Sequence, residues 1–290
     1  MLDPKTYQEA LVNYHSMIGY DGTSSNLSKM SSSGRSSTKS QKWVVVSDPH
    51  LPNERVDWLA TIAQRHKGAN LILAGDVLNL DRCSRWAQID HSEPDLETLF
   101  QRRDDFVRTL RTALRRVVVM GGNHDARLWK KAAALGADYY WLTQEFFKQM
   151  FPTELGVEYV WKPFQKRNGR TIYTAYYHQI GDALVGHIER SGVTPVRGGK
   201  LANEFFHAWR DDLKLNPFRV VLQAHTHKRG YHFDPVTRVH CWETGAMCDN
   251  PDYAVLDHRS SPVQGGYFWL VQREGITDLT ESRLFIMENQ

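Results

Sequence analysis

Residues 42–78 read KWVVVSDPHLPNERVDWLATIAQRHKGANLILAGDVL and alternate between two hydrophobic patterns. The two ends of this stretch, residues 42–46 and 70–74, are short β-branched or aliphatic runs of the kind that forms buried strands. Between them, residues 53–68 carry apolar side chains at helical spacing and finish at a glycine, which indicates a helix. The stretch therefore predicts a strand, a helix and a second strand.

The same alternation continues toward the C-terminus. Residues 95–116 have helical spacing, and residues 117–120 read as a third strand that runs into a loop. Residues 265–287 are typical of a hairpin around Glu274 and Gly275. Further apolar runs lie at residues 182–187, 219–227 and 237–246. Strands joined by helices predict an α/β fold, with a mostly parallel sheet covered by helices.

Composition limits the class of protein. The 290-residue chain is 41% hydrophobic, which is ordinary for a globular protein of one large domain or one domain with additions. Its 36 basic and 33 acidic residues give a net charge of +3, far from the balance of a nucleic-acid coat protein. The three cysteines are odd in number and form no CxxC pair, which argues against a disulfide framework and a thiolate zinc site. We therefore expect a protein of the reducing cytoplasm.

Three segments of the chain differ in character. Residues 1–41 combine a short helical pattern with a serine-rich stretch typical of a flexible linker, and residues 42–290 form the main domain. Within it, residues 128–180 are helical and aromatic, and we expect them to cap the site, with aromatic rings that either stack bases or pack a core. The chain lacks the roughly 20 consecutive apolar residues of a membrane-spanning helix, so we expect no membrane contact. Nothing in the sequence indicates an oligomeric state.

Five of the apolar runs end in polar side chains. Because the carboxyl ends of strands lie along one edge of an open α/β sheet, we expect these side chains to converge. The D-x-H and H-x-H spacings also place both members of each pair on the same side of an extended backbone. The residues are Asp48, His50, Asp76, Asn123, His124, Asp125, His187, His225 and His227.

The types of these side chains indicate a metal site. Carboxylate, imidazole and amide ligands without thiolate suit Mn²⁺, Fe²⁺ or Zn²⁺, and argue against calcium held by oxygen ligands alone. The ligands are too many for one ion, whereas a binuclear site, with ions about 3.5 to 4 Å apart and bridged by Asp76, accommodates them. We expect two divalent ions, with Mn²⁺ as the first choice and Fe²⁺ or Zn²⁺ as alternatives.

The motifs DxH, GD, GNHD, GH and AHTH, in this order, resemble those of the calcineurin-like metallophosphoesterase superfamily over about residues 43–285. The resemblance implies a four-layered α/β/β/α sandwich of two mixed sheets flanked by helices, with the site between the sheets. Two departures, Ala224 in place of glycine and Pro49 between two ligands, remove no metal-binding atom. The resemblance also implies one metal held by Asp48, His50, Asp76 and His227 and another by Asp76, Asn123, His187 and His225.

Two such ions predict hydrolysis of phosphate esters. They offset the charge of phosphoryl oxygens and lower the pKa of a bridging water toward 7, so that it attacks phosphorus. His124, beside the ligand Asn123, is then expected to protonate the leaving group, with Asp125 or Asp48 orienting its imidazole. The alternative is that His124 only hydrogen-bonds its loop.

The substrate is expected to contact arginines that follow the strand ends, unless these are solvated surface charges. They favour a phosphodiester of DNA, RNA or a nucleotide. A phosphomonoesterase acting on a protein or a metabolite, and a non-catalytic scaffold with a relict metal site, are the alternatives. The arginines are Arg82, Arg85, Arg127 and Arg190.

Overall fold

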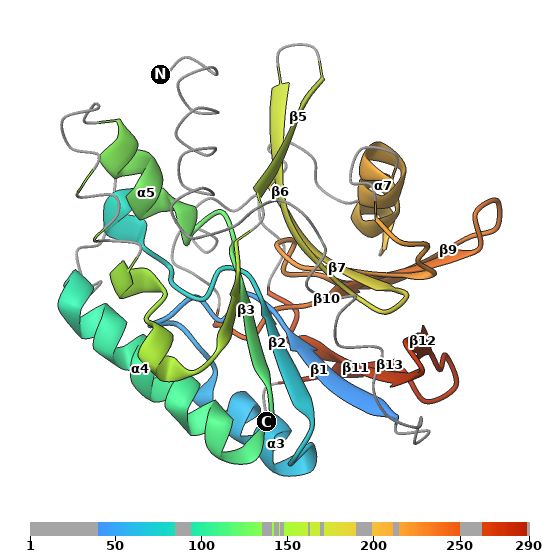
Figure 1. The fold of residues 1–290 in the computed structure, drawn as a ribbon, viewed down its shortest axis with the longest axis horizontal. Helices are drawn as coiled ribbons and strands as arrows, with labels where there is room; N and C mark the ends of the chain where they lie inside the picture. Colours follow the sequence, from blue (N-terminus) through green and yellow to red (C-terminus); the bar gives the residue numbers. More distant parts are fainter. Residues whose placement is uncertain are drawn as a thin grey trace, which may run out of the picture.

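Two mixed β-sheets face each other in the computed structural model (Figure 1). The first contains seven strands: β1 Gln41–Val46, β2 Asn70–Ala74, β3 Val117–Met120, β4 Glu158–Val160, β11 Gly266–Arg273, β12 Ile276–Thr277 and β13 Arg283–Ile286. Their order is β12-β11-β1-β2-β3-β4, with β13 also paired to β11. Strands β1 to β4 are parallel to one another, and β11 is antiparallel to β1. The structure describes residues 40–84, 94–134, 141, 145, 148–161, 163–168, 171–189, 199–210, 215–249 and 263–288.

The second sheet contains six strands in the order β5-β6-β7-β8-β10-β9. Strands β7, β8 and β10 are parallel, and the remaining pairs are antiparallel. The parallel centre of each sheet directs the carboxyl ends of its strands toward one end of the molecule. The bounds are β5 Pro163–Asn168, β6 Thr171–Ile180, β7 Ala183–Glu189, β8 Val220–Gln223, β9 Arg229–Asp234 and β10 Val239–Thr244.

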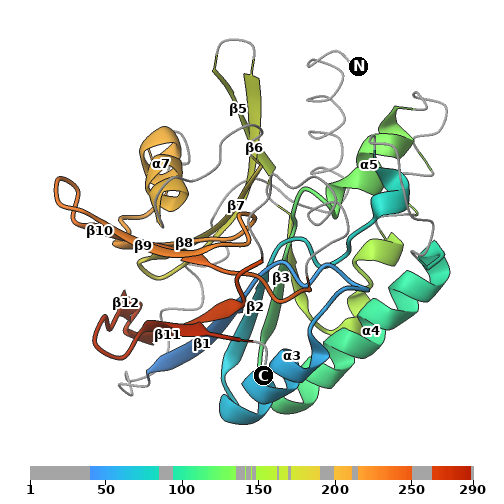
Figure 2. The same cartoon turned by 180° about the vertical axis from the view of Figure 1, so that it is seen from behind.

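Helices cover the outer faces of both sheets. The amphipathic α3 (Val56–Arg65) and α4 (Leu96–Ala113) pack on the first sheet, and α7 (Lys200–Trp209) packs on the second (Figure 2). A third apolar core, with residues such as Val45 and Leu222, fills the space between the sheets. This four-layered arrangement confirms the predicted α/β/β/α sandwich.

Local sequence signals set the ends of several elements. The carboxylate of Asp95 accepts a hydrogen bond from the Thr98 N–H at 2.8 Å and caps α4, which stops where Leu114 becomes extended. Strands β11 and β12 pair across Glu274 and Gly275, which both have positive φ, as the predicted hairpin requires. No helix in the described ranges combines the length and apolarity needed to cross a membrane.

The two segments with an expected special role lie partly outside the described ranges. Of the segment 1–41, for which a helix and a linker are predicted, only residues 40 and 41 are described, and Gln41 begins β1. In the segment 128–180, α5 (Ala126–Ala133) starts the helical part, whereas residues 158–180 contribute β4, β5 and β6 to the two sheets. Strands β5 and β6 extend beyond the strands of the first sheet in both views (Figures 1 and 2). A cap over the site remains a prediction.

The described aromatic residues of this segment pack a core. Trp129, Trp161 and Tyr176 are buried and form one cluster with Ala126. The rings of Trp161 and Tyr176 lie 5.1 Å apart between centroids. For these three residues the core interpretation therefore holds in place of base stacking.

Candidate metal centre

The polar strand ends of both sheets meet at one end of the sandwich. The first sheet contributes the loops after β1, β2 and β3, and the second sheet contributes β7 and the loop after β8. Side chains from these segments form three overlapping groups in which potential ligand atoms lie within 4.8 Å of one another. The groups found among the described residues are Asp48, His50 and His227; His50, Asp76 and His124; and Asp76, His187 and His225.

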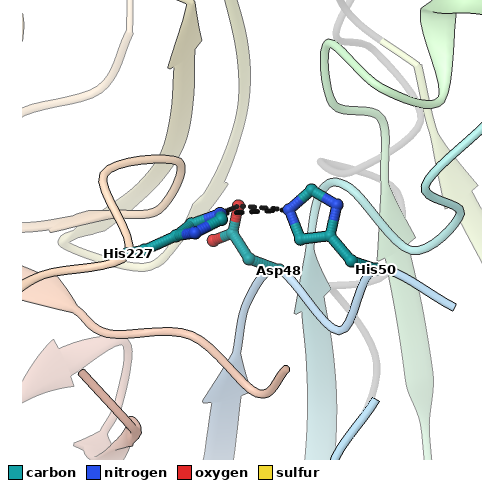
Figure 3. A group of neighbouring side chains, drawn as sticks. All are labelled: Asp48, His50 and His227. Carbon is teal, nitrogen blue, oxygen red and sulfur yellow. Dashed lines mark hydrogen bonds and ion pairs between the residues drawn. The ribbon is translucent and has the colours of Figure 1, made fainter. Parts of the chain in front are cut away.

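The first group brings two imidazoles against one carboxylate (Figure 3). His227 Nε2 lies 3.3 Å from Asp48 Oδ1, and His50 Nε2 lies 3.7 Å from the same oxygen. The two Nε2 atoms are 3.0 Å apart. These three atoms converge on a single point, as ligands of one ion do.

The third group is centred on His187. Its Nδ1 donates to the carbonyl of Ala74 at 2.9 Å, so Nε2 faces the Asp76 Oδ2 at 3.2 Å and the Asn123 Oδ1 at 3.0 Å. A backbone acceptor that orients a histidine in this way is typical of metal ligation. Burial by itself lowers the pKa of His187, but the Asp76 carboxylate raises it to about 10. The site therefore attracts positive charge.

Asp48 and Asp76 each leave one buried oxygen without a hydrogen bond. Asp76 Oδ1 accepts from the His124 N–H at 2.8 Å, and Asp48 Oδ2 accepts from the His225 N–H at 3.0 Å. Their other oxygens, Asp76 Oδ2 and Asp48 Oδ1, are buried and accept none. A buried unsatisfied carboxylate oxygen is costly, and a bound cation removes that cost. The donor set therefore fits two divalent ions.

Burial and neighbouring charge act in opposite directions on these carboxylates. Burial opposes the ionisation of Asp76, but the imidazoles of His187 and His124 hold its pKa well below the usual range. Burial likewise opposes the ionisation of Asp48. The neighbouring ring of His227 favours the ionised form, and the net effect is that the pKa of Asp48 is also lowered. Both carboxylates are thus present as the anionic form that binds metal.

Backbone strain is concentrated at the same residues. A non-glycine residue rarely adopts positive φ, and such conformations cluster at functional sites. Neighbouring glycines permit the close approach, because a Cβ at Gly75 would collide with His187 and one at Gly122 with Asp76. The expected ligands with positive φ are Asp48, His50, Asp76, His225 and His227.

Asn79 orients His124, a role that the sequence interpretation assigned to Asp125 or Asp48. His124 Nδ1 lies 2.9 Å from the Asn79 carbonyl and 3.0 Å from its side-chain oxygen, and can donate to either. Its Nε2 therefore points to the metal groups, 4.0 Å from Asp76 Oδ2. Burial, and then the charges of His50 and Arg127, hold the pKa of His124 well below 6.5 although Asp76 opposes this.

Asp125 is directed into the loop after β2. Its carboxylate accepts from the Leu78 N–H at 2.9 Å and from the Val77 N–H at 3.4 Å. Burial, followed by the charge of Asp76, raises its pKa to about 7. The prediction that Asp125 orients the imidazole of His124 is therefore corrected. Adjacent residues at the start of a helix point in different directions, so the Asp125 side chain cannot follow that of His124 toward the ligands.

Of the two expected arginines that the structure describes, Arg127 contacts the metal groups through His124. Its Nη2 is 2.9 Å from His124 Nε2, and its Nη1 donates to the Asn79 carbonyl at 3.0 Å and pairs with Asp81. Arg82 is exposed on the short 3₁₀ helix Asp81–Cys83, next to α5, whose Lys131 donates to the Arg82 carbonyl. Arg85 and Arg190 lie outside the described residues.

Comparison with known proteins gives one family. A family model described as calcineurin-like phosphoesterase matches residues 42–244. No curated protein matches the chain.

Solved structures with a similar fold include a metallophosphoesterase from Sphaerobacter thermophilus, at 14% identity and a TM-score of 0.43 over 86% of this chain and 90% of that one. A conserved uncharacterised protein from Streptococcus pneumoniae, a predicted phosphoesterase, matches at 13% identity and a TM-score of 0.29, over 87% of this chain and 100% of that one. Vps29 from Chaetomium thermophilum matches at 11% identity and a TM-score of 0.35, over 86% of this chain and 97% of that one. Since these similarities are low, the family model alone carries the assignment.

Proposed function

We propose that this chain, which belongs to the calcineurin-like phosphoesterase family, hydrolyses phosphodiesters of nucleic acids or nucleotides with two divalent metal ions. One observation carries the proposal: Asp48 and Asp76 each leave a buried, unpaired oxygen among histidines of three overlapping groups. A structural role would satisfy those oxygens with protein donors.

Two ligand sets support the binuclear arrangement. The unpaired Oδ2 of Asp76 lies 3.2 Å from His187 Nε2 and 3.8 Å from His50 Nε2, which places this carboxylate between the two sets. When bound, the ions offset the charge of the phosphoryl oxygens and lower the pKa of a water toward 7. We assign Mn²⁺, Fe²⁺ or Zn²⁺ to one set of Asp48, His50, Asp76 and His227, and to another of Asp76, Asn123, His187 and His225.

His124 is proposed as the general acid. Asn79 holds Nδ1, which leaves Nε2 as the atom that carries a proton to the leaving oxygen. In the substrate-free site, Arg127 Nη2 lies 2.9 Å from Nε2 and favours the unprotonated form. An anionic phosphate offers Arg127 another partner and raises the pKa of the imidazole, so substrate binding itself prepares the acid.

Cations near the metal groups support a phosphate-rich substrate. Arg127 is fixed by Asp81 and the Asn79 carbonyl, so it can contact a phosphoryl oxygen with little loss of side-chain freedom. Arg82 and Lys131 lie on neighbouring segments, the 3₁₀ helix Asp81–Cys83 and α5. Their positions suit the phosphates that flank a scissile diester.

The test compares two chromogenic esters. The protein is stripped of metal, reloaded with Mn²⁺, Fe²⁺ or Zn²⁺, and assayed on bis(nitrophenyl) phosphate and nitrophenyl phosphate, with bound metal counted by mass spectrometry. Two ions per chain and faster diester turnover are expected. Faster monoester turnover would replace the diesterase by a phosphomonoesterase, and absent turnover at full metal occupancy would leave the scaffold alternative. Asp57→Asn, at an exposed carboxylate that pairs with Arg55 and belongs to none of the groups, is the matched control for Asp76→Asn.

A further inference from the structure

Four rings lie side by side on the hairpin formed by β9 and β10. Tyr231 and Phe233 belong to β9 and pair in register with Trp242 and His240 of β10. The ring centroids of Tyr231 and Trp242 are 4.9 Å apart, and those of Phe233 and His240 are 4.8 Å apart. His240 and Trp242 stack with an interplanar angle of 15°, and the Tyr231 hydroxyl lies 2.9 Å from His240 Nδ1. We call these four residues the ring ladder.

One side of the ring ladder is anchored and the other is exposed. Trp242 packs on Phe268 of the first sheet, with ring centroids 4.9 Å apart, so it continues the core between the sheets. Tyr231 and Phe233 are 50% and 39% exposed, on a strand at the edge of the second sheet. An edge strand with exposed aromatic residues favours association, and a protein that keeps one usually uses it.

The ring ladder starts beside the metal centre and runs away from it. Strand β9 begins two residues after His227, and Tyr231 follows His227 by four residues. At about 3.3 Å per residue, this places Tyr231 within about 13 Å of that ligand along the strand. Strand β10 is parallel to β8, whose end leads to His225. A polymer bound across the metal groups can therefore extend along the ladder.

Charges at the metal end of the ring ladder suit an anionic polymer. Lys228 and Arg229 follow His227 directly. At the far end, Arg219 donates to Asp182 at 2.9 Å; burial first, and then the charge of Arg219, lower the pKa of His240. The acidic residue of β9, Asp234, is already engaged by His207 and Thr237. Rings flanked by cations characterise surfaces that bind single-stranded nucleic acid.

We propose that the ring ladder stacks the bases of a single-stranded nucleic acid whose backbone reaches the metal centre, with Tyr231 and Phe233 as the exposed platforms. This inference rests on the proposed function for the phosphodiester at the metals. Aromatic rings with polar atoms and flanking cations fit bases better than they fit the aliphatic surface of a protein partner.

Binding is measured on the full metal-loaded chain by fluorescence anisotropy. The probe is a labelled twelve-nucleotide oligothymidylate with phosphorothioate linkages, which resist hydrolysis. Tyr231→Ala and Phe233→Ala are each expected to weaken binding about tenfold, and the double variant more. Tyr231→Phe and Phe233→Tyr keep the rings and are expected to bind like the parent. Val236→Ala removes an 86% exposed side chain from the same hairpin and is the matched control.

Turnover of bis(nitrophenyl) phosphate separates this inference from the proposed function. That small ester does not reach the ring ladder, so all these variants are expected to hydrolyse it at the parent rate. If the parent binds the oligonucleotide through the ladder but hydrolyses no ester, the inference stands and the proposed function fails. Unchanged oligonucleotide binding in the double variant would overturn the inference. A double variant that changes only the sedimentation of the protein would also overturn it and would identify a self-association surface.

Discussion

Asp76 and Asp182 are buried aspartates at opposite ends of the interface between the two sheets. Asp182 accepts hydrogen bonds from the Thr277 N–H at 2.8 Å, from Arg219 Nε at 2.9 Å and from Gln272 Nε2 at 3.4 Å. Asp76 has one satisfied oxygen, and its Oδ2 accepts no hydrogen bond. Burial alone therefore does not identify a functional carboxylate. The distinction between these two aspartates lies in the partners of their oxygens: Asp182 is saturated by protein donors, whereas Asp76 Oδ2 faces the imidazoles of His50 and His187 and is left for a ligand.

Strand β7 connects the two ends. Asp182 immediately precedes it, and His187 lies five residues further along, at the metal groups. The strand is thus tied to β11 and β12 at one end through Asp182 and Thr277, and it presents a ligand at the other. The two ends of this one strand can therefore be compared directly by substitution.

The largest effect is expected from Asp76→Asn. The change removes the charge between the two ligand sets, and we expect more than a 100-fold loss of ester turnover, since even the partners that orient metal ligands cost 10- to 100-fold. In the metal-free state the variant should unfold more readily than the parent, because it loses the carboxylate whose pKa His187 and His124 hold well below the usual range. Turnover, bound metal and urea unfolding are measured together, with Asp57→Asn as control. Two retained ions and unchanged turnover would contradict the assignment of Asp76 as a metal ligand and break the comparison.

His124→Gln is expected to lower turnover by about 100-fold with both metals retained, because glutamine keeps a polar side chain but supplies no acidic proton. Metal content is determined by mass spectrometry and turnover with bis(nitrophenyl) phosphate. Full turnover at full metal occupancy would remove His124 from the mechanism and leave it with a role in loop structure.

Much of this centre could be predicted from the sequence, because parallel strands bring their carboxyl ends to one edge. Asp48, Asp76 and His187 each follow or end an apolar run, so their positions in the sequence indicate that these side chains converge at one edge of the fold. The role of Asn79 was missed because it lies three residues beyond Asp76 in a loop whose conformation no periodicity reveals. Likewise, the positive φ of His225 depends on tertiary contacts, and a non-glycine residue gives no signal of it.

The pairing of the strands could not be predicted from local sequence patterns. The aromatic segment of residues 158–180 alternates weakly, and its assignment to two different sheets depends on partners such as β3 and β7, which lie far along the chain or follow later. The hairpin at Glu274 and Gly275 was predictable because its signal is local.

Asp182→Ala is expected to lower the free energy of unfolding by about 2 kcal/mol, because several buried donors lose their acceptor. Arg219 is 49% exposed, so solvent screening reduces the contribution of its ion pair with Asp182 to this loss of stability. Turnover per folded, metal-loaded molecule should remain close to that of the parent, as measured by urea titration and an ester assay. Glu281→Ala, at an exposed carboxylate of the turn after β12, is the control. A change in turnover larger than the change in stability would show that the two ends are coupled.

Asn79→Ala is expected to reduce turnover about tenfold while metal content stays constant, as for other groups that orient a working side chain. Because Asn79 acts through His124, the pH profile of turnover should shift as well, whereas a purely structural change would only lower the amount of folded protein. A loss of turnover at full metal content without any shift of the pH profile would exclude the proposed positioning role.

The smallest effect is expected at His66, a satisfied histidine on the outer face of the first sheet. Its Nε2 lies 2.9 Å from the Tyr267 hydroxyl, and its ring stacks on Trp269. Burial, and then the charges of Arg65 and Arg283, lower its pKa from 6.5 to about 4. The folded protein therefore favours the neutral ring, and the resulting stability is complete above pH 6.5 and declines as the pH falls toward 4.

His66→Phe keeps the stacking and removes the titration. Melting temperatures of parent and variant, measured between pH 8 and pH 4, should fall less steeply for the variant below pH 6.5, while ester turnover at pH 7.5 stays equal. The metal ligands contribute equally to both pH curves, so the difference isolates His66. Parallel curves would mean that His66 titrates alike in the folded and unfolded chain. A variant that loses turnover would be more consequential, because a satisfied group distant from the metal centre would then control activity, and hydrogen-bond saturation would no longer separate structural from functional residues.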